Sequence, residues 1–197
     1  MPQPQQEFRA FTIRHDLLAA RIQTPAQVSD AYDPDHVPDL IPVMVEVKAL
    51  WDTGATGSVI TATTARALSL IPSGRSMVRH AGGTSWQDTY VVNVILPNKV
   101  GIVGVRVSEC SPDVGDFGLI IGMDIITKGD LAISNVSGHT CMTFRYPSVA
   151  TTDYVEDFNR HRYAGVPRNA PCPCGALDAS GKPVKFKRCH GRVLGQT

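Results

Sequence analysis

The chain has 197 residues, of which 19 are Lys or Arg and 18 are Asp or Glu, so its formal net charge is +1. This length suits one domain, or one small domain with an appendage. A charge near zero provides no global field for nucleic acid or an anionic membrane, and no apolar run is long enough to cross a bilayer. Net charge therefore does not select the partners of this protein, and we expect no membrane association.

The N-terminal residues and the cysteine count favour a cytoplasmic location. Residues 1–6 are polar and lack the apolar segment of a secretory signal. The chain has five Cys, an odd number that fits a closed disulfide framework poorly. The sequence therefore predicts a cytoplasmic protein whose cysteines stay reduced.

The first 168 residues are typical of a β protein. Short runs that are rich in Val and Ile, or that alternate apolar and polar residues, are separated by Gly, Pro and Asn. This is the pattern of strands joined by turns. We expect strands, in chain order, at residues 8–14, 43–48, 90–96 and 100–107. Residues 24–39 contain three prolines and several acids, so we predict a loop there.

Two short helices are also predicted. The first covers residues 62–68, with Thr61 as its N-cap. The second begins near Asp153, which is followed three residues later by Glu156, as in a capping box. The expected fold class is therefore all-β with short helices.

The character of the chain changes near residue 169. Three of the five cysteines, Cys172, Cys174 and Cys189, lie beyond this point. Residues 169–197 carry five Lys or Arg and one Asp, which leaves 14 basic and 17 acidic residues in 1–168. We therefore predict a basic, cysteine-rich tail after an acidic β domain.

The most informative segment is Ala-Leu-Trp-Asp-Thr-Gly-Ala-Thr-Gly-Ser-Val-Ile at residues 49–60. An apolar strand here runs into Asp52 and then into a glycine-rich turn, which places a carboxylate where the backbone bends. A second apolar run ending in glycine, Leu-Ile-Ile-Gly-Met-Asp, occupies residues 119–124. In this order and at this separation, the two motifs resemble those of the retropepsin-like (retroviral-type) aspartic proteases, over residues 40–144.

The resemblance implies a closed β-barrel that is half of a protease. In that family the second run packs beside the loop that carries the aspartate, and the helix after it completes the floor of the domain. We therefore expect four parts: an N-terminal strand and loop extension at 1–38, a retropepsin-like domain at 39–147, a helical linker at 148–168 and the tail at 169–197.

One aspartate is not enough for this chemistry. Hydrolysis of a peptide bond without a metal or a covalent intermediate needs one carboxylate to activate water and another group to protonate the carbonyl. Two carboxyls about 3 Å apart do both, because they cannot both ionise. Since the chain has a single Asp-Thr-Gly, the resemblance implies a homodimeric endopeptidase with Asp52 from each subunit, a polypeptide substrate and no catalytic cofactor.

The resemblance also assigns roles around Asp52. Thr53 would hydrogen-bond across the two-fold axis, and Gly54 would give the substrate backbone room and a carbonyl. Ala55 would help to line the cleft. Thr56 stands where viral members usually carry a substrate-binding acid, so the sequence is closer to bacterial and cellular retropepsin-like proteins.

A mobile flap is expected between the two motifs. The candidate is the segment His-Ala-Gly-Gly-Thr at residues 80–84, in which Gly82 and Gly83 supply positive φ at no steric cost. Closure of such a hairpin over a substrate would exclude water. The bulky Trp51 needs room next to Asp52, and one hypothesis is that it blocks the cleft.

Two other interpretations of the first motif stay open at this point. Asp-x-Gly-x-Thr, formed by Asp52, Gly54 and Thr56, also resembles the phosphate-binding turn of actin-type ATPases, but those folds need far more chain. The other is a dimeric module of the same fold that binds a partner and cleaves nothing.

The tail contains a second constellation of functional residues. Cys-Pro-Cys-Gly at residues 172–175 is followed, after a basic stretch, by Cys189 and His190. Three thiolates and an imidazole are a complete tetrahedral set for a structural zinc ion. The pattern resembles the SEC-C motif, the zinc knuckle at the C-terminus of the SecA translocation ATPase. It differs in length, because 14 residues separate Cys174 from Cys189, more than is usual there.

Zinc would explain how so short a segment folds, since its affinity becomes folding energy. The alternative is a disordered basic tail with incidental thiols. As the related knuckle contacts a chaperone and the ribosome, the resemblance implies a docking module for a protein or ribosome partner. The basic residues and Phe186 also suit RNA or an acidic protein.

Overall fold

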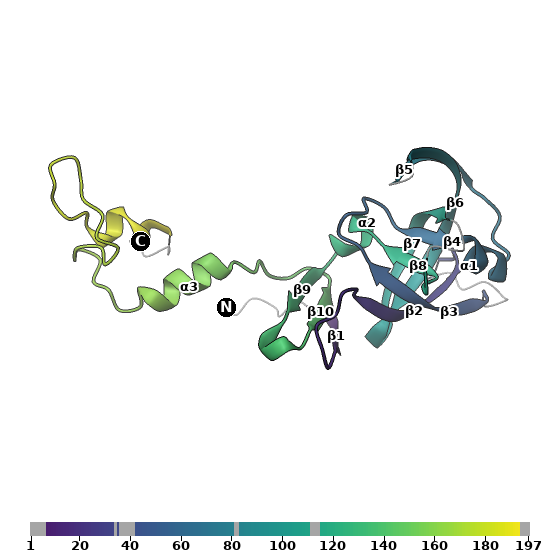
Figure 1. Cartoon of the computed structure of the whole chain (residues 1–197), viewed down its shortest axis with the longest axis horizontal. Coiled ribbons are helices and arrows are strands. Elements are labelled where there is room, and N and C mark those ends of the chain that lie inside the picture. Colours follow the sequence, from purple (N-terminus) through teal and green to yellow (C-terminus); the bar gives the residue numbers. More distant parts are fainter. Residues whose placement is uncertain (1–6, 34, 36–41, 81–82, 111–114, 194–197) are drawn as a thin grey trace. The chain divides into compact units, whose positions relative to one another are not determined.

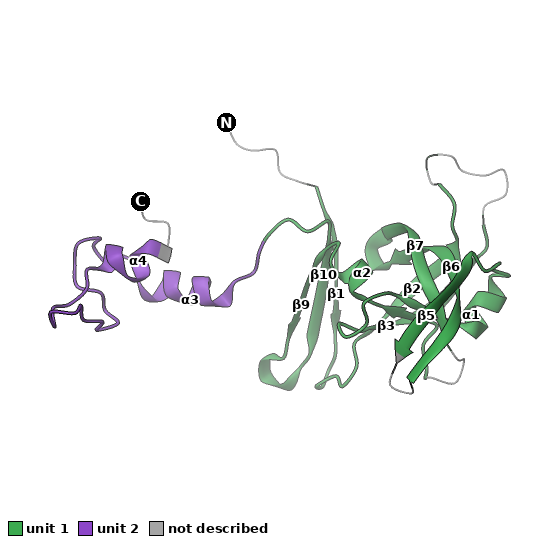
Figure 2. Ribbon diagram, turned by 90° about the horizontal axis from the view of Figure 1, so that it is seen from above, with its two compact units in different colours: residues 1–150 green, residues 151–197 purple. Residues whose placement is uncertain are grey.

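The computed structural model describes residues 7–33, 35, 42–80, 83–110 and 115–193 (Figure 1). The chain forms two compact units, residues 1–150 and 151–197 (Figure 2). None of the described helices is long and apolar enough to pass through a membrane.

Unit 1 is built on a closed barrel of six strands. Around the ring the strands are β2 (Gln23–Asp30), β3 (Met44–Trp51), β8 (Leu119–Ile121), β4 (Val59–Thr61), β7 (Val100–Cys110) and β6 (Gly83–Leu96). A direct pairing of β6 with β2 closes the ring. The strand β5 (Gly74–His80) extends this sheet as a hairpin with β6. The expected closed all-β barrel is therefore confirmed.

The alternating strand pattern fills the interior of the barrel. Strand β6 buries every second residue from Tyr90 to Leu96, and β7 buries Val100, Ile102, Val105 and Val107. A side chain that leaves water in this way contributes about 1.5–3 kcal/mol. The β6–β7 turn contains Asn98 and Lys99, both at φ 55°, as a type I′ hairpin turn requires.

A second sheet of three strands stands beside the barrel (Figures 1 and 2). Its order is β1 (Arg9–Arg14), β10 (Cys141–Tyr146) and β9 (Asp130–Ser134). Its inner face carries Phe11 and Phe144, whose rings lie 6.2 and 5.0 Å from that of Trp51. This aromatic cluster joins the two sheets into one core.

The helices of unit 1 are short. Helix α1 (Ala62–Ala67) begins at Thr61, whose side chain accepts from the N–H of Thr64, and α2 (Met123–Ile126) follows β8 directly. Two 3-10 turns, η1 (Pro97–Lys99) and η2 (Val136–Gly138), join neighbouring strands. The predicted cap and helix at residues 61–68 are confirmed.

Unit 2 contains α3 (Tyr154–Arg162), η3 (Phe186–Arg188) and α4 (His190–Val193). Asp153 caps α3 as predicted, because its carboxylate accepts from the N–H groups of Val155 and Glu156. Tyr163, at the end of α3, is buried against Phe186, with ring centroids 5.7 Å apart. The helix and the cysteine-rich segment therefore belong to one compact unit, residues 151–197.

The prediction of a loop at residues 24–39 is wrong for its first part, because residues 23–30 form strand β2. The loop was predicted because Pro25 cannot donate a backbone hydrogen bond to a neighbouring strand. It lies where β2 pairs with β3 alone, since the pairing with β6 starts only at Gln27. Proline is tolerated at such edge-like positions. Residues 34 and 36–41 lie outside the described part of the chain.

Candidate active site and metal centre

Asp52 lies at the start of the loop that joins β3 to β4. Its backbone N–H donates to the carbonyl of Ile121 at 3.0 Å, and its Oδ1 accepts from the N–H of Gly54 at 2.8 Å. A Cβ at Gly54 would lie only 3.2 Å from that oxygen. The residue after Thr53 is thus a glycine because a side chain would crowd the carboxylate.

The second motif lies directly beside this loop. Strands β3 and β8 run parallel, with Trp51 opposite Ile121. The N–H of Met123 donates to the carbonyl of Ala55 at 2.8 Å. A Cβ at Gly122 would come within 2.6 Å of the Gly57 backbone, so only glycine allows this approach. The predicted contact between the two motifs is confirmed.

The side chains of Ser58 and Asp124 link the same two segments. The sequence did not predict this contact. Ser58 is 2% exposed, and its Oγ donates to Asp124 Oδ1 at 2.7 Å and accepts from the N–H of Gly122 at 3.1 Å. Ser58 is therefore a brace between the Asp52 loop and the start of α2.

An apolar floor lies next to Asp52. Leu50, Ile120 and Val59 are directly opposite one another on β3, β8 and β4, so their side chains share one face of the sheet. All three are half-buried. Trp51 points the other way, is 8% exposed, and donates from Nε1 to Thr24 Oγ1 at 3.0 Å. The hypothesis that Trp51 blocks the cleft is therefore wrong.

The expected flap coincides with the β5–β6 hairpin. The strands pair from Gly74 opposite Thr89 to His80 opposite Gly83, and Gly83 has φ 119°. Gly82 lies outside the described residues. The hairpin has the form expected of a flap, whereas the roles of its glycines stay predictions.

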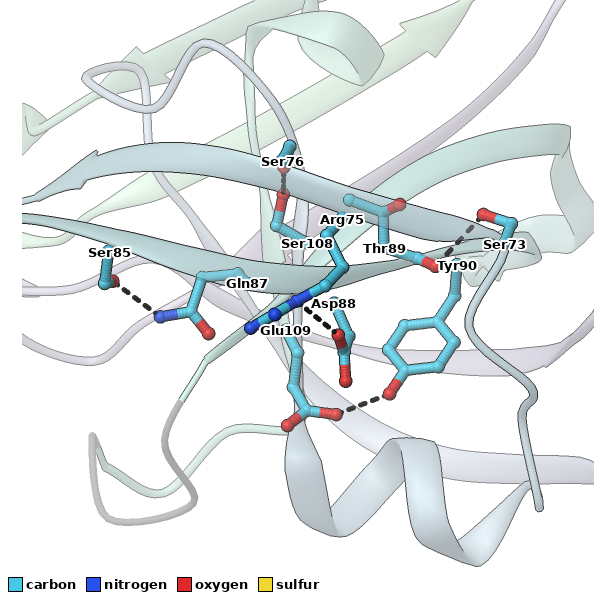
Figure 3. A network of polar contacts seen from close by, with 10 residues as sticks. All are labelled: Ser73, Arg75, Ser76, Ser85, Gln87, Asp88, Thr89, Tyr90, Ser108 and Glu109. Carbon is cyan, nitrogen blue, oxygen red and sulfur yellow. Dashed lines mark hydrogen bonds and ion pairs between the residues drawn. The ribbon is translucent and has the colours of Figure 1, made fainter.

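Polar contacts hold the base of this hairpin to the barrel (Figure 3). Ser76 of β5 lies 3.4 Å, Oγ to Oγ, from Ser108 of β7, and Arg75 forms an ion pair with Asp88 at 3.2 Å. Further contacts join Ser73 to Thr89 and Gln87 to Ser85.

Tyr90 and Glu109 form a part-buried contact of this network. The Tyr90 hydroxyl donates to Glu109 Oε2 at 2.6 Å (Figure 3). Burial and this hydrogen bond to a carboxylate both raise the pKa of Tyr90. Tyr90 therefore stays a neutral donor that anchors β6 to β7 below the hairpin.

In unit 2 the four predicted metal ligands come together. Cys172, Cys174, Cys189 and His190 place their ligand atoms within 4.8 Å of one another. His190 Nδ1 lies 3.4 Å from the sulfurs of both Cys172 and Cys189, and the sulfurs of Cys174 and Cys189 are 3.6 Å apart. A tetrahedral zinc ion with Zn–S bonds of about 2.3 Å requires sulfurs just under about 4 Å apart. The four side chains thus fit this ion.

The thiols differ in acidity. Burial raises the pKa of Cys172, but hydrogen bonds from the Cys174 backbone and from His190 outweigh burial and bring it to about 6. Burial and the neighbouring thiols raise the pKa of Cys189 to about 11. A bound cation would have to displace the proton of Cys189, so metal affinity should rise with pH.

Comparisons with known proteins agree with this geometry. Residues 44–125 match the family model described as aspartyl protease. No curated protein matches the chain.

Solved structures similar to the chain include two cellular ones. One is a retropepsin-like aspartic protease from Rickettsia conorii, with 11% identity, a TM-score of 0.46, and coverage of 73% of this chain and 99% of that one. Another is the retroviral protease-like domain of Ddi1 from Leishmania major, with 18% identity, a TM-score of 0.39, and coverage of 58% and 82%. The simian foamy virus protease shows 14% identity, a TM-score of 0.35, and coverage of 52% and 89%.

The family match includes both motifs and all residues between them. Together with the closed barrel and the Asp52 loop, this match supports the expectation of a retropepsin-like aspartic protease domain over residues 44–125.

Proposed function

We propose that two copies of this chain form one aspartic endopeptidase site, with Asp52 of each copy at a shared two-fold axis. The observation that carries the proposal is the braced Asp52 loop, which offers one carboxylate beside an apolar floor. Thr53, Gly54, Thr56 and Gly57 on this loop are exposed, which leaves the loop accessible to a second copy.

The pair of carboxyls would share one proton, since two charges so close cannot both form. The ionised Asp52 takes a proton from water as the water oxygen attacks the peptide carbonyl carbon. The protonated Asp52 gives its proton to the carbonyl oxygen. Collapse of the resulting diol breaks the C–N bond, and the amide nitrogen leaves with a proton from the pair.

The other loop residues complete the proposed site. Thr53 hydrogen-bonds to its copy across the axis, while Gly54 and Ala55 line the cleft and receive the substrate backbone. Thr56 takes the place of the viral acid. Gly82 and Gly83 let the tip of the β5–β6 hairpin close over the substrate.

The test is mass-spectrometric profiling of an unfolded protein incubated with the purified chain. We expect cleavage by the wild type with a bell-shaped pH dependence, and at least a 100-fold loss in Asp52→Asn. The matched control, Asp157→Asn on α3, should cleave as the wild type does. Cleavage that is unchanged by Asp52→Asn would exclude this function.

We further propose that unit 2 is a SEC-C-like zinc knuckle that docks the protease on a partner. Its support is the Cys172, Cys174, Cys189 and His190 cluster and the basic residues around it. A protein or the ribosome suits this charge. We expect one zinc ion per chain by elemental analysis, none in Cys172→Ser, and a full ion in the control Cys141→Ser.

A further inference from the structure

We propose that helix α3 pairs antiparallel with α3 of a second copy, so that the two cysteine-rich units of a dimer are joined into one body. This inference rests on the proposed function, because the protease dimer is what brings the two helices together. The contact lies in unit 2, outside the protease domain. It would present two knuckles to a docking partner in a fixed arrangement.

Helix α3 exposes its apolar side chains. Tyr154, Val155 and Phe158 are 72%, 70% and 59% exposed, and the guanidinium carbon of Arg162 lies 5.7 Å from the centre of the Phe158 ring. At 3.6 residues per turn, positions 154, 158 and 162 lie one above another on the same face of the helix. These four residues therefore form a continuous surface, which we call the α3 stripe.

The α3 stripe is not the face by which the helix packs in its own unit. Tyr163 is buried and contacts Phe186 and His190, with ring centroids 5.7 and 4.6 Å apart. Glu156 and Asn159, which lie on the same face as Tyr163, are half-buried. In most amphipathic helices of globular proteins the apolar face is the buried one. The reverse arrangement in α3 points to a further surface that covers the stripe.

The charges of α3 favour a second copy as that surface. Its acids lie in the first turn and its basic residues in the last, namely Glu156 and Asp157, and Arg160, His161 and Arg162. With the N-cap Asp153, three acids stand against two Arg, a formal charge of −1 with His neutral. A helix with so little net charge attracts neither RNA nor a strongly acidic protein. An antiparallel copy instead brings each acidic half beside a basic half and opposes the two helix dipoles.

The α3 stripe is self-complementary in this orientation. A two-fold axis at Phe158 brings the two Phe158 rings together. It also places Tyr154 beside Arg162 of the second copy, because each residue is four positions from the axis. The Arg162 guanidinium would then lie between two aromatic rings, a favourable cation–π arrangement. Two helices tethered to one protease dimer meet at a high effective concentration, so a contact as short as this one can form.

The first test places the photo-reactive residue p-benzoylphenylalanine at position 154 in a mixture of isotope-labelled and unlabelled full-length chains. We expect irradiation to join labelled to unlabelled chains through the last turn of α3, as identified by peptide mass spectrometry. The same residue at position 177, where the exposed Leu177 lies on the cysteine-rich segment, is the control and should give no such product. Cross-links to the first turn, which a parallel pair predicts, would overturn the proposal.

The second test compares Phe158→Glu with Leu177→Glu, each combined with the photo-reactive residue at position 154. Both positions are exposed, so both chains should keep dispersed amide spectra. We expect Phe158→Glu to reduce the yield of the cross-link by about 10-fold or more, because two carboxylates would meet at the axis. Leu177→Glu should retain the yield. A cross-link that survives in Phe158→Glu would overturn the proposal.

Cleavage of an unfolded polypeptide, measured on the same samples, separates this inference from the protease function. At chain concentrations far above the dimer Kd, Phe158→Glu should cleave as the wild type does, because the α3 stripe is no part of the Asp52 site. A chain that cross-links through α3 but cleaves nothing would refute the protease and leave the helix pair standing. A chain that cleaves without cross-linking from position 154 would refute the helix pair alone, and a chain that is monomeric at every concentration would refute both.

Discussion

At the residue scale, the Asp52 loop depends on a buried serine. The hydroxyl of Ser58 partners both the carboxylate of Asp124 and the N–H of Gly122. Leaving a buried polar group without a partner costs about 1–3 kcal/mol. The loop position is thus held by groups that do not touch a substrate.

We predict that Ser58→Ala lowers the unfolding free energy by about 2 kcal/mol and reduces kcat more than KM, because the loop shifts while the cleft floor stays. Thr63→Ala, an exposed position on α1, is the control and should change neither. Urea unfolding followed by tryptophan fluorescence measures stability, since both tryptophans, Trp51 and Trp86, lie in unit 1. Equal losses in the two variants would show that Ser58 is not a brace.

The pair formed by Ser58 and Asp124 also shows where sequence reasoning ends. The two residues are 66 positions apart. The hydrophobic periodicity of the sequence predicts strands and helices, but it does not predict which buried serine contacts which acidic residue. The Asp-Thr-Gly turn was recognisable because its three residues are adjacent. Gly122 was recognisable as part of a motif, although its contact with Gly57 required the parallel register of β3 and β8.

At the element scale, local signals predicted local structure. Thr61 and Asp153 cap helices within four residues of themselves, so their roles follow from sequence. Strand β2 was missed because Pro25 was interpreted as a loop residue, whereas the pairing of this strand with β3 and β6 is set by tertiary contacts. The identity of β9 as an edge likewise depends on the order of the sheet.

In the β9–β10 hairpin, hydrogen bonds and an ion pair hold the carboxylate of Asp130. Its carboxylate accepts from Ser148, from the Val149 N–H at 3.0 Å and from Arg145 at 2.6 Å. The hydrogen bond from Ser148, helped by the Val149 N–H and Arg145, lowers the pKa of Asp130 to about 2, although burial opposes the change. The folded state therefore binds a proton at Asp130 less readily than the unfolded chain.

A pKa lowered in the folded state adds stability above the unfolded value near 4, and this stability is lost as pH falls toward 2. We predict that Asp130→Asn lowers the unfolding free energy by about 1 kcal/mol at pH 7, after allowance for solvent screening. The difference from the wild type should shrink as the pH falls below 4. Urea unfolding at pH 7, 5 and 3 measures this, and Asp116→Asn, an exposed ion-pair residue, serves as the control. A difference that does not depend on pH would contradict the assignment.

At the scale of the whole molecule, the near-neutral net charge is the sum of an acidic β domain and a basic tail. The two units also differ in what stabilises their folds. The core of unit 1 is a barrel closed by six strands. The hydrophobic core of unit 2 is the cluster of Tyr163, Cys172 and Phe186, with Val166 and Cys189 packed against it. So small a core cannot offset the chain entropy without a metal ion.

We therefore predict that a chelator unfolds unit 2 and leaves unit 1 intact. Amide resonances of residues 151–193 should lose their dispersion, including those of α3, because Tyr163 connects this helix to the knuckle through Phe186 and His190, at 5.7 and 4.6 Å between ring centroids. Cleavage of an unfolded polypeptide should be unchanged, since none of the four ligands belongs to unit 1. Cys172→Ser should reproduce the effect of the chelator, and Cys110→Ser should not. If unit 2 keeps its dispersed spectrum without metal, its fold comes from the aromatic contacts alone and the structural role of zinc is wrong.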